Sequence, residues 1–385
     1  MRRALAPDPA DARRLAERHG VADGKFLVFD ASAGVPALDG MDAAVAMARD
    51  GRALAACDRA LFDRGFLRLD DDTLAPASLY LRSSRISDVN ALGGRTRGTV
   101  AMSNLGHNAG FANQLFQYAF LKLYGLRNNA AIETPPWLGE TVYGLPRRRI
   151  SRALRMRKGD EWSVRDLALW SMERAPVDVD FWGYYQNVPE SWRQHRAFLR
   201  RLYEPLPPWR APVERWLARH VPAGATLVAI HLRRGDYRAY DPAQKPWFQL
   251  IPEEWYLRWL DAVWPGLANP VLFVASDDRA AVLPSFRRFA PLTSAEAEAE
   301  MPEPRLIADL EIMAQANLLA ICNSSFSRVA ALLAPPSQRC FIPAIATQNF
   351  EPYDPWATDH FWQRFGAPEP RRRSLLPRFL RRKAP

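Results

Sequence analysis

The sequence has few cysteines and no long apolar run. Its three cysteines, Cys57, Cys322 and Cys340, are odd in number and lack metal-ligand spacing, which is typical of a reducing compartment. No stretch approaches the roughly 18 consecutive apolar residues of a membrane-spanning helix. The first twenty residues contain arginines but no apolar core of the secretory-signal type. We therefore expect a cytoplasmic protein without a membrane span.

The composition excludes several other classes of chain. Hydrophobic residues make up 48% and charged residues 24%, close to the average of soluble globular proteins. A wholly disordered chain, a collagen-like chain and a coiled coil are thereby excluded. With 385 residues, the chain is long enough for two or three domains, each with a core of its own.

The net charge of +10 comes from two basic blocks. Seven positive charges lie within residues 371–383 and seven more within residues 147–158, and neither block contains an acid. Neither block has interleaved stacking aromatics or a nucleic-acid-binding motif, so we expect no nucleic-acid partner. The C-terminal block has leucines and Phe379 between its charges, and this pattern favours a peripheral position on an anionic membrane surface.

The first 95 residues differ from the rest and predict a small accessory module, either α/β or winged-helix-like, of unknown role. Helical periodicity covers residues 11–19 and 43–62, with a strand at 25–30 between them. The segment Gly65–Asp72 resembles a strand that runs into a turn.

Strands and helices alternate from about residue 98, which predicts an α/β fold with parallel sheets and crossover helices. We expect strands at 99–103, 226–232, 271–275, 320–322 and 339–342, and helices at 111–124, 306–319 and 326–333. The Pro-rich stretch 204–212 is a plausible hinge between two units. The predicted organisation is an accessory module (1–95), two Rossmann-like domains (96–212 and 213–365) and a basic tail (366–385).

Three polar clusters follow predicted strands of the second domain. Ligands of open α/β sheets bind beyond the carboxyl ends of the strands, so these clusters can converge on one ligand. They are His231–Tyr237 (HLRRGDY), Ser276–Asp278 (SDD) and Asn323–Arg328 (NSSFSR).

Each cluster has a functional interpretation and a structural one. Arg233 and Arg234 can bind a diphosphate, although they point to opposite faces of a strand; alternatively they form a solvated strand end neutralised by Asp236. A carboxylate of Asp277 or Asp278 can accept from a guanine, or can cap the helix that follows. The hydroxyls of Ser324 and Ser325 can bind an anion at a helix N-terminus, or simply cap it.

A fourth polar group lies in the first domain. A glycine-containing loop with His107 leads into a helix that carries Asn113, Gln114 and Gln117. The spacing of these carboxamides places them on one face near the helix start, where they can bind sugar hydroxyls or phosphate. Alternatively, they form a polar face buried against the second domain.

Four motifs, in order over about residues 100–345, resemble the α-1,2-fucosyltransferase family of glycosyltransferases (family 11). GFANQLFQYAF is similar to the family's G-x-G-N-Q-x-F-Q-Y-A signature, and HLRRGDY to its H-x-R-R-G-D-Y donor motif. WGYYQN resembles the G-Y-x-Q segment, and CNSSFSRVAALL the S-N-S-T-F-S-W-W motif. Residues 1–95 and those after about 365 lie outside the resemblance.

The resemblance implies a GT-B architecture, in which two facing Rossmann-like domains bind GDP-fucose and transfer fucose with inversion, without a metal or other cofactor. The acceptor would be a glycan or lipid-linked hydroxyl in surface polysaccharide synthesis. Arg233 would hold the diphosphate, with Asp236 and Arg234 bracing the site and His231 against the nucleotide. The remaining roles implied are guanine contact for Asp277 or Asp278, β-phosphate contact for Ser324 and Ser325, and a cleft lining formed by Asn113, Gln114 and His107.

The sequence departs from the family pattern at two places. Ala112 replaces the glycine before Asn-Gln, and Arg328-Val329 replaces the Trp-Trp pair. The general base is open among Asp236, Glu133 and His107.

Three other functions stay open at this point: a transferase that uses another GDP-sugar, a non-catalytic nucleotide-sugar-binding protein, and a metal-dependent transferase. The last would use Asp70-Asp71-Asp72 or Asp277-Asp278 as ligands, because carboxylate oxygens suit Mn²⁺.

Overall fold

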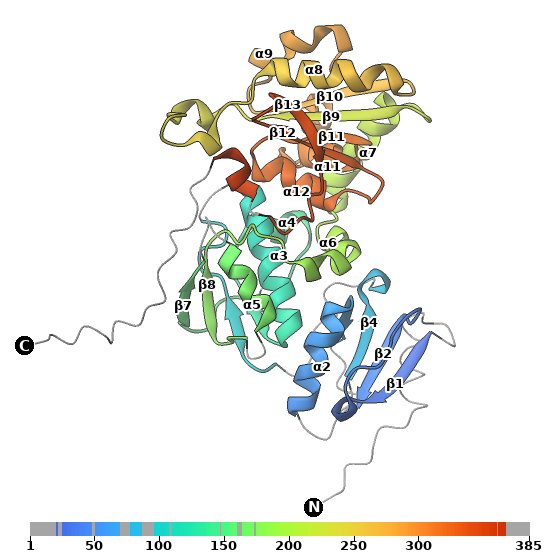
Figure 1. The fold of residues 1–385 in the computed structure, drawn as a ribbon, viewed down its shortest axis with the longest axis vertical. Helices are drawn as coiled ribbons and strands as arrows, with labels where there is room; N and C mark the ends of the chain where they lie inside the picture. The colour runs from blue at the N-terminus through green and yellow to red at the C-terminus, as the bar shows by residue number, and fades with distance from the viewer. Residues whose placement is uncertain are drawn as a thin grey trace, which may run out of the picture.

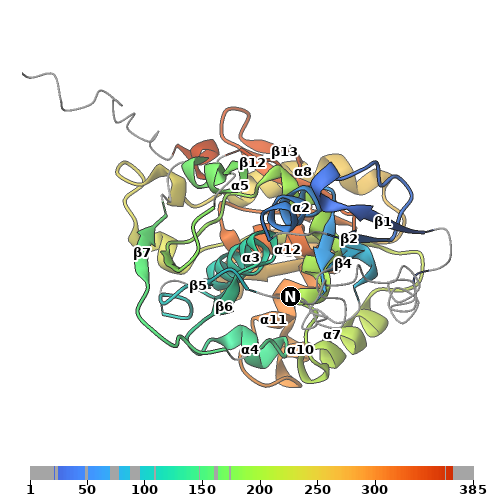
Figure 2. The same cartoon turned by 90° about the horizontal axis from the view of Figure 1, so that it is seen from below.

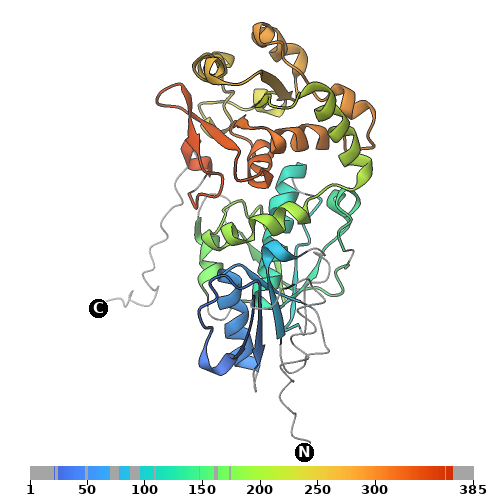
Figure 3. The same cartoon turned by 90° about the vertical axis from the view of Figure 1, so that its right-hand side faces the viewer.

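The computed structural model contains three β-sheets that follow one another along the long axis of the molecule (Figures 1 and 3). The structure describes residue 21 and residues 25–47, 51–69, 78–86, 96–107, 110–146, 148–159, 164–172, 175–359 and 361–366. The predicted helix at 11–19, the Asp70–Asp72 run and the basic tail lie outside these residues.

The N-terminal sheet has the order β1-β2-β4-β3. Its strands are β1 (Phe26–Asp30), β2 (Ala43–Met47), β3 (Phe66–Arg68) and β4 (Ser78–Arg82), and helix α2 (Gly51–Asp63) packs against it. Strands β1 and β2 are parallel. The module is therefore α/β, as one of the two alternatives predicted. The helix predicted over 43–62 was wrong in its first part, since residues 43–47 form the buried strand β2.

The middle sheet has the order β6-β5-β8-β7, and all its pairs are parallel. Its strands are β5 (Thr99–Ala101), β6 (Ala131–Glu133), β7 (Arg155–Lys158) and β8 (Val179–Trp182). The long helix α3 (Phe111–Asn128) crosses from β5 to β6. Its Phe120 and Tyr124 pack edge-on against Phe181 of β8, which explains why the aromatic face of this helix is buried.

The C-terminal sheet has the order β10-β9-β11-β12-β13 and is parallel except for β13. Its strands are β9 (Thr226–Leu232), β10 (Pro270–Ser276), β11 (Leu318–Ala320), β12 (Arg339–Ala344) and β13 (Asn349–Tyr353). Successive residues of β9 point to opposite faces. Leu227 and Ala229 belong to the same core as α11 (Ile307–Gln315) and α12 (Ser325–Leu333), whereas Val228 and Ile230 pack with α8 (Glu253–Val263).

The core does not stop between the middle and C-terminal sheets. Phe116 of α3 and Val329 of α12 belong to one hydrophobic cluster, and α3 packs directly against α12. In the view along the long axis, both helices lie near the centre of the molecule (Figure 2). The polar residues at the start of each helix are therefore held close to this junction.

Further helices complete the described part of the chain. They are α4 (Leu138–Val142), α5 (Ala168–Ser171), α6 (Arg196–Leu202), α7 (Pro207–His220), α9 (Arg279–Val282) and α10 (Ala295–Ala299), together with 3-10 turns such as Phe361–Phe365. No helix among the described residues combines the length and apolar character needed to cross a bilayer.

The predicted α/β class is confirmed: two Rossmann-like units of parallel strands and crossover helices, with a small N-terminal module. The bounds of one predicted helix and strand were wrong. The helix predicted over 306–319 ends at Gln315, and β11 begins at Leu318, two residues before the predicted strand. The Pro-rich stretch 204–212 includes the start of α7, where Pro207 and Pro208 occupy the first helical turn, and its role as a hinge stays a prediction. The boundaries predicted at 95, 212 and 365 stay predictions.

Candidate functional site

The three polar clusters predicted to converge do meet at one edge of the C-terminal sheet. They follow β9, β10 and β11, which are neighbours in the order β10-β9-β11. The Arg233 guanidinium contacts the Asp277 carboxylate at 3.0 Å, and His231 Nδ1 lies 3.2 Å from Cys322 Sγ. Tyr237 Oη donates to the carbonyl of Asn323. Contacts therefore join all three segments beyond the carboxyl ends of their strands.

Arg233 and Arg234 point to opposite sides of the sheet, as predicted from strand geometry. Arg234 is buried on the α8 side, where its Nη2 donates to Glu253 Oε1 at 2.7 Å and to the carbonyl of Ile251 at 2.9 Å. Arg233 points to the same side of the sheet as His231, and its side chain is 35% exposed to solvent. Arg234 thus has a structural role, and Arg233 is the arginine that a ligand can reach.

Two carboxylates orient the Arg233 guanidinium. Asp236 Oδ1 accepts from Nε at 2.9 Å and contacts Nη2 at 2.8 Å, while Asp277 Oδ2 lies 3.0 Å from Nη1. Asp277 also accepts the backbone N–H of Arg234 through Oδ1 at 2.7 Å. Both oxygens of Asp277 are therefore occupied in holding the loop, and the predicted guanine contact stays a prediction.

Gly235 permits the close approach of this loop to Asp277. A Cβ atom at position 235 would stand 2.4 Å from Asp277 Oδ2, well inside the limit of real contacts. The glycine of the RRGD run is thus required by the position of Asp277.

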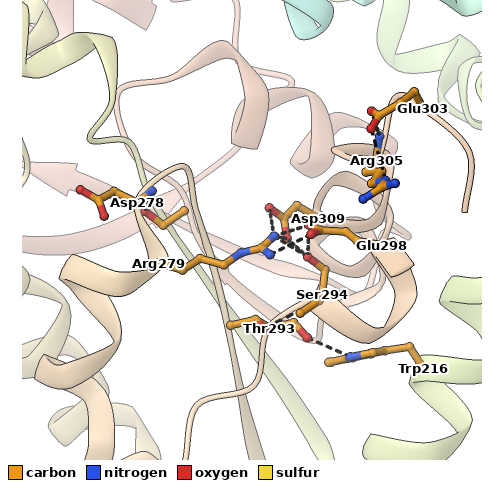
Figure 4. Close-up of polar contacts among 11 residues, drawn as sticks. Trp216, Asp278, Arg279, Thr293, Ser294, Glu298, Glu303, Arg305 and Asp309 are labelled. Atoms are coloured by element: carbon orange, nitrogen blue, oxygen red, sulfur yellow. Dashed lines mark hydrogen bonds and ion pairs between the residues drawn. The ribbon is translucent and has the colours of Figure 1, made fainter. Parts of the chain in front are cut away.

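Asp278 has a structural role. It is the N-cap of α9, where its Oδ1 accepts the backbone N–H of Ala281 at 3.2 Å, and its Oδ2 pairs with Arg238 at 2.5 Å. The capping alternative is thus confirmed for this acid. Figure 4 shows Asp278 pointing away from the cluster to which its neighbour Arg279 points.

A buried polar cluster around Arg279 was not predicted. Arg279 donates to Glu298, Ser294 and Asp309, and Ser294 Oγ lies within hydrogen-bond distance of both carboxylates, to one of which its single proton is donated (Figure 4). Burial raises the pKa of Asp309 to about 6, against the opposing effects of Arg279 and Ser294. The partners of Arg279 lie 15 to 30 residues from it in sequence, in or next to α10 and α11, so no local pattern links the members of this cluster.

His231 is a neutral imidazole at physiological pH. Burial, followed by the charge of Arg233, lowers the pKa of His231 to about 3. Burial also raises the pKa of Cys322 to about 11, so its thiol is protonated, and Sγ lies 3.2 Å from His231 Nδ1. The tautomer of the imidazole ring decides which of these two atoms donates.

The start of α12 carries the predicted serines. Ser324 is the N-cap, and its Oγ accepts the backbone N–H of Phe326 at 3.3 Å, which confirms capping. Ser325 is partly buried in the first turn. Asn323 is fixed by donating to the carbonyls of Trp247 and Gln249 at 2.9 and 2.8 Å. A phosphate role for Ser324 and Ser325 stays a prediction.

The carboxamides of α3 divide into a structural and an accessible group. Gln117 is fully buried and donates to the carbonyl of Gly183 at 2.7 Å, which attaches α3 to the loop after β8. Gln114 is buried as well, whereas Asn113 is partly exposed and accepts from Gln186 Nε2 at 2.5 Å. Gln186 belongs to the WGYYQN segment but was given no role from the sequence.

The three candidates for a general base differ in environment. Glu133 is buried and accepts from the backbone and hydroxyl of Ser151 at 2.8 Å each, so it holds the loop that contains Ser151. Asp236 is exposed and bound to Arg233. His107 is exposed on the loop before α3. Asp236 and His107 are therefore the two whose side chains a ligand can reach.

The hypothesis of a metal-dependent transferase is not supported by a set of metal ligands in the part of the chain that the structure describes. Asp277 and Asp278 pair with arginines, and no group of three or more His, Cys, Asp or Glu side chains is arranged to hold an ion there. Asp70–Asp72 lie outside the described residues.

The fold and the site define an α/β protein with a candidate binding site at the carboxyl ends of the strands of its C-terminal sheet, and several solved structures resemble the chain in part. No family model and no curated protein sequence matches the chain. Fucosyltransferase NodZ from Bradyrhizobium is 14% identical with a TM-score of 0.44, covering 68% of this chain and 100% of that one.

Two further structures are similar to the same extent. A mutant of Arabidopsis thaliana FUT1 in complex with GDP is 12% identical with a TM-score of 0.45, covering 65% of this chain and 70% of that one. POFUT1 in complex with GDP is 12% identical with a TM-score of 0.41, covering 66% and 98%. These ligands and activities are properties of those proteins.

Proposed function

We propose that the chain is an inverting glycosyltransferase that moves fucose from GDP-fucose to an acceptor hydroxyl, with α-1,2 linkage as the finer proposal. The observation that carries it is the accessible Arg233 guanidinium, held by Asp236 and Asp277 beyond the carboxyl end of β9. It lies within the HLRRGDY segment, whose resemblance to a fucosyltransferase donor motif supplies the substrate.

The chemistry follows from the charge that develops during transfer. The bond between fucose and GDP breaks through a cation-like sugar, so negative charge grows on the diphosphate oxygens. A guanidinium already oriented by two carboxylates donates to those oxygens without reorganising, which is the most effective form of electrostatic catalysis. In this proposal, His231 lies against the nucleotide, and Asp277 acts as a brace of Arg233.

The same proposal includes a mechanism without a metal and an acceptor that is a glycan or is lipid-linked. It also includes a role in surface polysaccharide synthesis and a peripheral position on the membrane through the basic tail. Transfer that uses another GDP-sugar is the second candidate, because Arg233 would bind the diphosphate of any of them.

A donor panel tests the proposal. GDP-fucose, GDP-mannose and GDP-glucose are incubated with the protein, with and without galactoside acceptors, and released GDP is measured in the presence and absence of EDTA. We expect GDP release from GDP-fucose that is faster with acceptor and unchanged by EDTA. Release from another GDP-sugar alone would establish the second candidate, and GDP binding without release would establish a non-catalytic protein.

Gly235→Ala is expected to weaken GDP binding at least tenfold. The added Cβ atom pushes Asp277 away, so the ion pair that orients Arg233 is lost. Titration calorimetry with GDP measures the effect. Gly266→Ala is the matched control, because a Cβ atom there meets nothing within 4 Å. Equal affinity in the two variants would show that Asp277 does not brace Arg233.

A further inference from the structure

Strand β7 (Arg155–Lys158) is an open edge of the middle sheet. It is the last strand in the order β6-β5-β8-β7, and β8 is the only strand of the described chain with which it pairs. All four of its side chains are exposed. The described part of the chain therefore covers neither face of this strand, and its outer backbone edge meets no other strand there.

The side chains of β7 carry three positive charges and no negative one. Because successive residues of a strand point to opposite faces, Arg155 and Arg157 lie on one face. Met156 and Lys158 lie on the other, where Lys158 Nζ is 5.3 Å from the centre of the Trp182 ring. None of the three cations lies within ion-pair distance of a carboxylate of the described chain, so their charges are uncompensated.

The exposed arginines of α7 are arranged differently. Three of them each pair with a glutamate of the described chain: Arg210 with Glu204, Arg215 with Glu300 and Arg219 with Glu296. The opposite charge in each pair cancels most of the field of the arginine at a distance, and salt screens the rest. The three cations of β7 have no such partner, so they keep a field that attracts an anionic surface.

The most exposed large hydrophobic side chain of the described residues also belongs to β7. Met156 is 51% exposed and lies between the two arginines of the strand. An exposed apolar side chain gains free energy where it leaves water. The edge therefore combines positive charge with an apolar group, and these are the two contributions by which peripheral proteins bind an anionic bilayer.

Strand β7 lies on the side of the molecule at which the described chain ends. Figures 1 and 2 both show β7 and the red 3-10 turn Phe361–Phe365 on the left, whereas α7 lies on the right. The C-terminal basic block, residues 371–383, follows this turn in the sequence. The two basic blocks of the chain thus belong to one side of the molecule or continue from it.

We propose that β7 is a docking surface for an anionic lipid bilayer. Its three cations bind the phosphate groups of the lipids, and Met156 enters the boundary between head groups and acyl chains. The long aliphatic stems of arginine and lysine allow charges from both faces of the strand to turn toward one plane at its outer edge. A bilayer fits better than a soluble acidic peptide, because it offers an anionic layer and an apolar phase side by side. The inference adds a second contact to the membrane-peripheral position in the proposed function, but it does not depend on the reaction that the chain catalyses.

Neutralising the three cations tests the proposal. The full chain with Arg155→Gln, Arg157→Gln and Lys158→Gln is sedimented with vesicles of phosphatidylcholine, alone or mixed with phosphatidylglycerol. We expect the partition onto the mixed vesicles to fall by about 10²-fold, from the contribution of each basic residue near an anionic surface. Met156→Ser should lower this partition about fivefold, by a factor that salt changes little.

Two further variants of the full chain serve as controls. Arg210→Gln, Arg215→Gln and Arg219→Gln together change the net charge by the same amount on α7, so the partition should stay within about twofold of the unmodified chain. Arg155→Lys, Arg157→Lys and Lys158→Arg together keep the charge of β7 and should bind as the unmodified chain does. Thermal unfolding followed by circular dichroism verifies that each variant is folded. A partition of the neutralised β7 variant equal to that of the α7 control would overturn the proposal.

A soluble probe distinguishes a bilayer from a partner that adds a strand. A peptide of alternating glutamate and valine replaces the vesicles, and hydrogen exchange of residues 155–158 is followed by mass spectrometry. If the peptide protects these amides and the phosphatidylglycerol vesicles do not bind, β7 is a site of strand addition and the proposal is wrong. No donor sugar enters either measurement. Vesicle binding through β7 without turnover of a GDP-sugar therefore leaves this inference standing while the proposed function fails, and turnover without such binding does the opposite.

Discussion

Under the proposed function, Arg233→Ala is expected to lower the turnover of GDP-fucose by about 10²–10³-fold. The variant removes the accessible guanidinium that lies between Asp236 and Asp277, and with it the donor to the developing charge of the diphosphate. It also leaves two carboxylates facing the position of the phosphates, so GDP binding should weaken by a similar or greater factor. Initial rates of GDP release and calorimetry with GDP measure the two effects.

Arg215→Ala provides the control for Arg233→Ala. Arg215 is an exposed arginine of α7 that pairs with Glu300, so its removal changes the net charge equally without touching the binding edge. An Arg233→Ala variant as active as this control would remove the proposed role of Arg233 and leave the function of the chain open.

Arg279→Met is expected to reduce the free energy of unfolding by about 3 kcal/mol. Arg279 is the cation that compensates the buried carboxylate of Asp309 and the partly exposed carboxylate of Glu298 (Figure 4), and its loss leaves two negative charges next to one another. The midpoint of thermal unfolding should fall by roughly 4 °C, given the size of the chain. Arg288→Met is the control, since Arg288 and Asp261 form an exposed pair whose contribution is below about 1 kcal/mol.

The deficit of Arg279→Met should be smaller at pH 5 than at pH 8. Burial raises the pKa of Asp309 to about 6 in the native protein, so the folded state retains a proton that the unfolded state loses as the pH rises above about 4. The contribution of protonated Asp309 to the free energy of unfolding is therefore lost as the pH rises from about 4 to about 6. Without Arg279 the pKa of Asp309 rises further and the loss continues to higher pH. A deficit independent of pH would show that Asp309 is not the carboxylate left uncompensated.

The second parallel sheet was largely predictable because its signals are local. Strand β9, a largely apolar segment, has the predicted bounds. Helix α12, which follows the capping residue Ser324, begins one residue before the prediction. A helix was wrongly predicted for residues 43–47 because alanine and methionine have high intrinsic helix propensity. In the fold these residues are buried between β1 and β4, and this pairing overrides their intrinsic preference.

The candidate site was predictable where it depends on strand ends and not where it depends on distant partners. Alternation along β9 correctly separates Arg233 from Arg234. The partners of Arg279 and Gln186 could not be found, because Asp309 and Trp362 lie 30 and 176 residues away. The capping of α9 by Asp278 was predicted as an alternative and is confirmed, because a cap needs only the residues beside it.

The shared core of α3 and α12 has a consequence for how the chain gains and loses its structure. Phe116 and Val329 are buried in the same hydrophobic cluster. Unfolding of either Rossmann-like unit would therefore expose apolar surface of the other to water. The two units should therefore denature in a single cooperative step.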